Sequence, residues 1–276
     1  MTKKKHLGTK TKIRTEKERE RRIATAIFLA FILLIVAFSA YFTYTFLSPS
    51  PNQTVNPVNS QLRVAIVDHL SLTFPNQTFI QTATNTLKQA GYTVDYYPGE
   101  KVTVDFYRNL PTHGYSLIIL RVHSALREGS SFLALFTSEP YIKTKYVYEQ
   151  LTDRVGMVQY HTGGDVYFGI SHEFILATMN GRFQGTTIIM MGCNGLQYTP
   201  IAKAFIEKGA KVYIGWTNSV LASHTDMATT QLIKHLITEK QTIEQAVDNT
   251  MKEVGSYLTG KNILIYCPLE VGDQTI

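Results

Sequence analysis

Cysteine is scarce in this chain of 276 residues, which has only Cys193 and Cys267. Small exported domains without a large core depend on several disulfides, so this count indicates a domain held together by an ordinary hydrophobic core. No internal repeat is visible. The chain also lacks a glycine-rich phosphate loop after its first predicted strand, at Asp68, which counts against a flavodoxin-like sensor that binds a small ligand.

An excess of positive charge is missing from most of the chain, although the formal net charge is +6. Residues 1–22 hold ten of the 27 Lys and Arg residues and three of the 21 Asp and Glu residues. The remainder has 17 basic and 18 acidic residues. Because the basicity is confined to a tail, we expect no nucleic-acid partner for the folded part of the chain.

Charge is absent altogether from residues 23–47, a run of 25 mostly apolar residues. As a helix with a rise of 1.5 Å per residue it would be roughly 37 Å long, enough to cross a bilayer with some tilt. Aromatic residues gather at its distal end, as in an interfacial belt. They are Tyr41, Phe42, Tyr44 and Phe46. The run predicts one transmembrane helix, with the lipid bilayer as a partner.

The basic tail precedes this run, and no charge follows it until Arg63. The positive-inside bias therefore predicts a signal anchor in the cell membrane, with residues 1–22 in the cytoplasm and the C-terminal part outside. A cleaved signal peptide is the competing interpretation, because residues 37–39 (AFS) weakly resemble a cleavage site. Residues 48–61 are rich in Pro, Asn, Ser and Gln and indicate a linker. Residues 62–276 then form the folded domain.

Apolar runs and helical spacings alternate along residues 62–276, which predicts an α/β fold with a mostly parallel sheet of six strands. Residues 125–160 are less regular and predict an excursion over the sheet edge, such as a hairpin or lid. The predicted strands are residues 62–67, 92–97, 117–122, 186–191, 210–216 and 263–266. The predicted helices are residues 79–90, 102–110, 174–179, 200–208, 225–238 and 242–253.

Two of these buried runs end in chemically active residues. Residues 116–123 (SLIILRVH) end at His123, and residues 186–195 (TTIIMMGCNG) contain Cys193. Parallel strands present their carboxyl ends at one edge of the sheet, where α/β proteins place their ligands. A thiol beside a base is the minimal equipment for covalent cysteine catalysis. Each residue taken alone is more often structural, but together they predict a dyad.

This order of motifs resembles the caspase-like (clan CD) cysteine peptidases, which include caspases, legumains, gingipains, clostripain, separase and CHAT domains. Residues 190–195 (MMGCNG) are similar to the Ala-Cys-Asn stretch of CHAT proteins. Residues 202–216 (AKAFIEKGAKVYIGW) look like the helix–strand segment of gingipains and CHAT domains. The resemblance covers residues 62–255 and implies a caspase-like three-layer sandwich. It also implies a peptide or protein substrate and a cysteine endopeptidase that needs no cofactor.

Within that resemblance, Cys193 is the nucleophile and His123 the base, and the amides of Ser124 and Cys193 form the oxyanion hole. Ser124 stands where the family has glycine. A catalytically inactive surface binding or scaffolding module is therefore the alternative function. A second alternative pairs Cys193 with Cys267 in a disulfide, which would remove the nucleophile.

Two carboxylates are candidates for substrate binding. Asp68 ends the first predicted strand and could favour a basic substrate residue, although a turn or cap role is the simpler interpretation. Asp226 is the second candidate, although the first turn of a helix also suits it. His224 and Asp226 are too commonly spaced to indicate a metal pair, so no metal site is expected. Arg121 suits a buried ion pair.

Overall fold

The structure is a computed structural model that describes residues 25, 28–39, 62–126, 133–257 and 262–276. The chain divides into two units, Met1–Ser60 and Gln61–Ile276. In the first unit, residues 28–39 are helical. The predicted tail 1–22 and linker 48–61 lie outside the described residues, as do positions 23–24, 26–27 and 40–47 of the predicted anchor. Among the helices that are described, none has both the length and the apolar character needed to cross a membrane.

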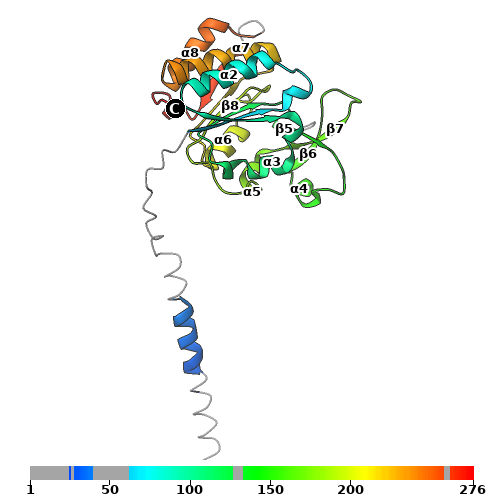
Figure 1. Ribbon diagram of the computed structural model, residues 1–276. Helices are drawn as coiled ribbons and strands as arrows, with labels where there is room; N and C mark the ends of the chain where they lie inside the picture. The colour runs from blue at the N-terminus through cyan, green and yellow to red at the C-terminus, as the bar shows by residue number, and fades with distance from the viewer. Residues whose placement is uncertain (1–24, 26–27, 40–61, 127–132, 258–261) are drawn as a thin grey trace, which may run out of the picture. The chain divides into compact units, whose positions relative to one another are not determined.

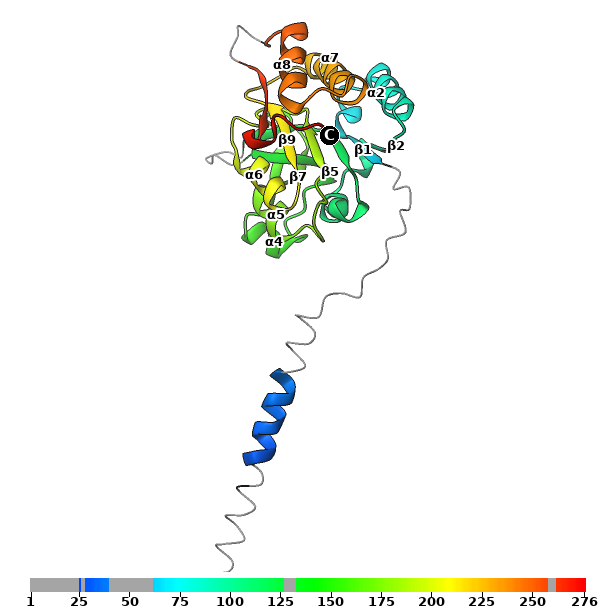
Figure 2. The ribbon, with the colours of Figure 1, turned by 90° about the vertical axis from the view of Figure 1, so that its left-hand side faces the viewer.

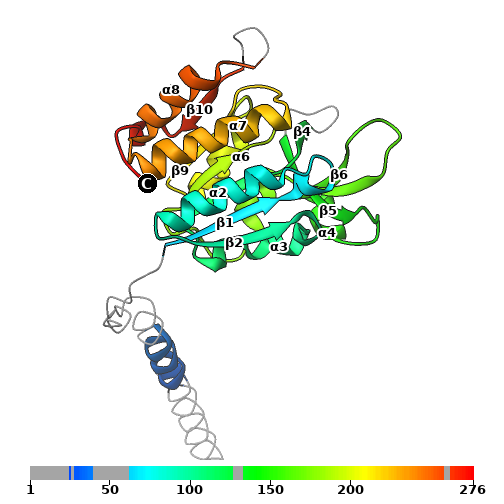
Figure 3. The same cartoon turned by 45° about the horizontal axis from the view of Figure 1, so that its top comes forward.

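The second unit is built on a six-stranded sheet with the order β10-β9-β8-β3-β1-β2 (Figure 3). Only β10 runs antiparallel to its neighbour, so the predicted α/β fold with a mostly parallel sheet of six strands is confirmed. The strands are β1 (Arg63–Asp68), β2 (Thr93–Pro98), β3 (Leu117–Arg121), β8 (Thr187–Met190), β9 (Val212–Trp216) and β10 (Leu264–Cys267).

Helices cover both faces of this sheet (Figures 1 and 2). One face carries α2 (Gln77–Gln89), α7 (Ala222–Ile233) and α8 (Ile243–Val254). The other carries α3 (Val104–Asn109), α5 (His172–Ala177) and α6 (Pro200–Glu207). Short 3-10 turns span His69–Leu72, Gly99–Lys101, Leu110–His113 and Leu269–Val271, and a π-helical turn spans Lys234–Thr238.

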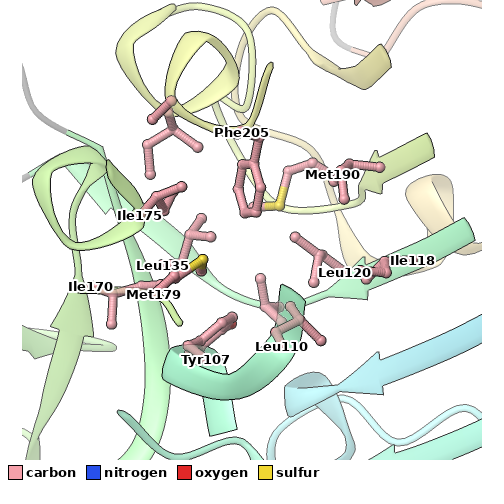
Figure 4. Packing of buried hydrophobic residues seen from close by; sticks show 14 of the residues in the cluster. Tyr107, Leu110, Ile118, Leu120, Leu135, Ile170, Ile175, Met179, Met190 and Phe205 are labelled. Carbon is pink, nitrogen blue, oxygen red and sulfur yellow. The ribbon is translucent and has the colours of Figure 1, made fainter. Parts of the chain in front are cut away.

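Alternating side chains of the central strands feed two separate cores, as a sheet buried on both faces requires. In β3, Ile118 and Leu120 face the α3, α5 and α6 side, where they pack with Met190 and Phe205 (Figure 4). Ile119 faces the α2, α7 and α8 side. The alternation fixes which face each residue beyond the strand end can reach.

The excursion predicted for residues 125–160 is larger than a single hairpin or lid and extends to residue 170. It contains a second, antiparallel sheet with the order β4-β5-β7-β6, seen beside the first sheet in Figure 1. Its strands are β4 (Ser124–Leu126), β5 (Leu133–Pro140), β6 (Val155–Gln159) and β7 (Val166–Ile170), and α4 (Val147–Leu151) lies between β5 and β6. Polar clusters such as residues 137–139 of β5 interrupt the alternation in these strands, so periodicity alone gives a weak signal.

Candidate active site

The parallel pairing of β3 with β8 brings the two predicted strand ends together. Leu120 lies opposite Met190, and the amide of Met191 still donates to the Leu120 carbonyl at 2.9 Å. His123 and Cys193 each stand three residues beyond this pair, at the same edge of the sheet. Continuing the alternation of faces sends both side chains toward the α2 and α7 side. The local sequences place His123 and Cys193 just after their strands, and the pairing of β3 with β8 brings these two strand ends side by side.

Both residues line one cavity of about 390 Å³. Its walls come from the loop between β1 and α2, from the ends of β3 and β8, and from the start of α7. The lining residues include Leu70, Phe74, Asn76, Arg121, His123, Met191, Cys193, Val220, Leu221 and Asp226. A concave, mostly apolar cavity of this size with a few polar groups at one end is typical of a small-molecule or side-chain binding site.

Cys193 is a free thiol that contacts Val220. Its Sγ lies 3.5 Å from the Val220 amide, which donates to it, and 3.6 Å from the Val220 carbonyl. An N–H donor aimed at sulfur stabilises a thiolate, and the carbonyl accepts the S–H of the neutral thiol. The next residue, Asn194, has φ 58°, so the chain turns sharply directly after Cys193. Cys193 therefore stands at the apex of a strand-to-loop turn.

The His123 ring is held from several sides. The Thr73 hydroxyl lies 2.9 Å from its Nε2 atom, which fixes the ring orientation and leaves Nδ1 for other partners. The rings of Phe74, Phe136 and Tyr160 surround it, with centroids 5.9, 5.8 and 4.9 Å away. Desolvation by this packing, followed by the nearby positive charge of Arg121, lowers the pKa of His123 to about 4. The imidazole is therefore neutral near pH 7, and the same two effects make it a weaker base than a free imidazole.

A second histidine lies against the first. His69 is fully buried, and its ring meets that of His123 edge-on at 5.8 Å. Its Nε2 atom lies 3.1 Å from the Tyr160 hydroxyl. Burial, followed by the charge of His123, lowers the pKa of His69 to about 4. Sequence reasoning missed Thr73, His69 and Tyr160, because none of them stands near His123 or Cys193 in the sequence.

A hydrogen bond from Ser124 joins the segments that follow β3 and β8. Its hydroxyl donates to the Cys193 carbonyl at 2.6 Å. Ser124 pairs with Leu135 of β5, while the Phe136 amide donates to the His123 carbonyl at 3.0 Å. This pattern makes Ser124 and Leu135 a non-hydrogen-bonded pair, so the Ser124 N–H points away from β5. An amide left unused by the sheet is what an oxyanion hole needs.

Gly192 permits this close approach. A Cβ atom there would lie 2.5 Å from the Val122 carbonyl and 2.6 Å from the Ser124 hydroxyl. Both distances are too short for a side chain of any size, so glycine is required for steric reasons. The residue before Cys193 thus lets the two strand ends touch.

Arg121 is fully buried and binds both predicted carboxylates. Its Nη1 donates to Asp68 at 2.7 Å, and its Nε and Nη2 donate to Asp226 at 2.7 and 2.8 Å. The remaining bond goes from Nη2 to the Phe74 carbonyl at 2.7 Å. The predicted buried ion pair of Arg121 is thus a triad, in which one guanidinium joins two carboxylates.

Neutral donors complete this triad. The Tyr96 hydroxyl donates to Asp68 at 3.0 Å, and the Asn76 side-chain amide donates to Asp226 at 2.8 Å. Burial raises the pKa of Asp68, against the opposing effect of Arg121. Asp226 lines the cavity, whereas Asp68 does not and is linked to it through Arg121. A substrate-binding role for either carboxylate stays a prediction, since both already have partners.

The remaining expectations concern the second cysteine and a metal site. Both cysteines are free, so the disulfide alternative is not formed here. Burial raises the pKa of Cys267, which lies on β10 and is only partly exposed. Across the described parts of the chain, no group of three or more His, Cys, Asp or Glu residues is placed to hold a metal ion.

Comparison with protein-family models and with curated proteins finds no match to this chain.

Proposed function

We propose that residues 62–276 form a cysteine endopeptidase of caspase-like type, in which Cys193 is the nucleophile and His123 the base. The observation that carries this proposal is the pairing of β3 with β8, which sets a thiol and a neutral imidazole beside one cavity. The helix-covered parallel sheet and the order of the two strand ends agree with the caspase-like architecture that the motifs resemble.

The reaction follows from these groups. His123 accepts the thiol proton, and the Cys193 sulfur attacks a substrate carbonyl carbon to form a tetrahedral oxyanion. The Ser124 and Cys193 amides donate to that oxyanion; one such donor is worth about 3 kcal/mol. The C–N bond then breaks, the amine leaves with the proton from His123, and a thioester remains. Water, deprotonated by His123, hydrolyses the thioester and restores the thiol.

Thr73 is the positioning group in this scheme. A base is effective when a third group holds its ring in one orientation, as in other nucleophile–base pairs. The Thr73 hydroxyl at Nε2 of His123 does this from the loop that follows β1. Nδ1 is then the ring nitrogen that faces the reaction.

A labelling experiment with matched controls tests the proposal. The full chain is treated with a peptidyl acyloxymethyl ketone that alkylates active-site thiolates, and the modified residue is located by mass spectrometry. Label is expected on Cys193, and it should disappear in Cys193→Ala and fall at least tenfold in His123→Ala. Cys267→Ala and His161→Ala, at a second cysteine and an exposed histidine, should label as the parent does. A Cys193→Ala protein that cleaves peptides at the parental rate would refute the proposal.

The second candidate is an inactive binding or scaffolding module with the same fold. One observation favours it: no hydrogen bond joins the His123 ring to Sγ among the described residues, and the thiol contacts Val220 instead. Catalytic hydrogen bonds are often long in unliganded sites and tighten with substrate, so this geometry is compatible with activity. Failure of every thiol-directed peptide probe to label Cys193 would select the inactive module.

We also propose that residues 23–47 anchor the domain in the cell membrane, with the C-terminal domain outside the cytoplasm. The support is the uncharged run and the basic tail before it. Membrane fractions washed with carbonate should retain the full chain and release a chain that begins at residue 48. Protease added to intact cells should digest residues 62–276, and their protection would reverse the proposed topology.

A further inference from the structure

The cavity beside Cys193 offers no unpaired charge to a substrate, although charged residues form part of its wall. The four carboxylate oxygens of Asp68 and Asp226 each accept at least one hydrogen bond from Arg121, Tyr96 or Asn76. Asp68 and Asp226 are 1 % and 4 % exposed. A basic substrate side chain would have to compete with a guanidinium that already binds Asp226 through two nitrogens.

An acidic side chain is disfavoured for the matching reason. Arg121 is 0 % exposed and donates four hydrogen bonds to Asp68, Asp226 and the Phe74 carbonyl. The guanidinium has five N–H groups in a fixed fork, so at most one remains, and it is buried. A carboxylate entering the cavity would also face Asp226 across a short, poorly solvated distance.

The rest of the wall is apolar. Leu70 and Met191 are buried within it, and Phe74 and Leu221 stand at the surface, 54 % and 55 % exposed. Because two large apolar side chains are half-exposed beside a nucleophile, binding of an apolar group that covers them is favourable. Val220, which contacts Sγ, joins Leu221 to Cys193, so the apolar wall begins directly at the sulfur.

From this arrangement we infer that the substrate residue whose carbonyl Cys193 attacks carries an apolar side chain of aliphatic or aromatic type. Phe74 and Leu221 cover that side chain, and Arg121 and Asp226, whose charges are paired within the triad, line the cavity without binding it. The inference rests on the proposed peptidase function and adds the class of residue after which the enzyme cleaves.

A series of probes that differ in a single residue tests the inference on the full chain. Acyloxymethyl ketones with Leu, Phe, Lys, Arg, Asp or Asn next to the reactive group are compared by their second-order rate of labelling Cys193. The Leu or Phe probe should react about 10- to 100-fold faster than the charged probes, the range that burial of one apolar side chain supplies. A Lys, Arg, Asp or Asn probe that reacts fastest overturns the inference and leaves the peptidase proposal standing. Absence of label with all six probes overturns both.

A charge placed at the mouth gives a second, independent readout. Leu221 is the N-cap of α7, a position that favours aspartate, so Leu221→Asp should fold. The ratio of Leu-probe to Lys-probe rates should fall at least tenfold in this variant. The matched control is Leu269→Asp, at a leucine that is 73 % exposed and does not line the cavity, and its ratio should equal that of the parent. An unchanged ratio in Leu221→Asp, with circular dichroism like that of the parent, overturns the inference.

Discussion

Removal of Arg121 tests whether the buried triad holds the site together. In Arg121→Met, Asp68 and Asp226 lose three charge-assisted hydrogen bonds, and the Phe74 carbonyl loses one. Bonds of this kind contribute about 1.5–3 kcal/mol each, but they do not add, because carboxylates stripped of their cation take up protons. We expect a loss of about 3–5 kcal/mol in the free energy of unfolding at pH 7.

The pH dependence separates this mechanism from simple loss of packing. Without Arg121 the pKa of Asp68, already raised by burial, rises further, so the native state binds protons that the unfolded chain does not. Stability linked to a raised pKa is present at low pH and is lost as pH rises through that pKa. The deficit of Arg121→Met relative to the parent should therefore shrink between pH 7 and pH 5.

The assay is equilibrium unfolding in urea, followed by the fluorescence of Trp216. It is the single tryptophan, it is fully buried, and its Nε1 donates to Thr225 at 2.9 Å. The control is Arg63→Met, which removes a half-exposed pair with Asp95 and should cost about 1 kcal/mol or less. A deficit in Arg121→Met that matches this control, or that grows toward pH 5, would refute the reasoning.

Three further results are expected. The free energy of unfolding should fall as pH is lowered from about 6.5 toward 4. Desolvation lowers the pKa of His69 and His123 to about 4, so the unfolded chain takes up these protons at a higher pH than the folded chain does. Urea midpoints that stay constant over this range would contradict this prediction. Thr73→Val should slow labelling of Cys193 about tenfold by freeing the His123 ring, whereas Thr73→Ser, which keeps the hydroxyl, should restore the parental rate. Gly192→Ala should destabilise the domain by about 1–3 kcal/mol, because its Cβ overpacks the ends of β3 and β8. The control is Gly156→Ala, where a Cβ meets nothing within 4 Å, and it should unfold at nearly the parental urea concentration.

Asn76 shows how structure changes the meaning of a short motif. Residues 76–78 (NQT) form a glycosylation sequon. In the fold, the Asn76 side chain accepts from the Phe79 amide at 3.1 Å as the cap of α2 and donates to Asp226 at 2.8 Å. In the folded domain Asn76 therefore has two structural hydrogen bonds, one as the cap of α2 and one to Asp226.

The sequence by itself predicted the six central strands and the helices around them, because continuous apolar runs and 3.6-residue spacings are local signals that burial on both faces imposes. It also predicted that His123 and Cys193 share an edge, since parallel strands place their carboxyl ends together. The antiparallel sheet of β4, β5, β6 and β7 was not predicted, because polar clusters interrupt the alternation of its strands.

Only the tertiary structure decided which distant residues complete the site. Arg121 binds Asp226 across 105 positions, and Tyr160 reaches His123 from beyond β6. Such partners are selected by loop paths and by packing between elements, and no local pattern in the sequence encodes them. The apolar character of the cavity has the same origin, because the sequence left Asp68 and Asp226 as candidates for substrate binding or for a structural role, and the fold pairs both with Arg121.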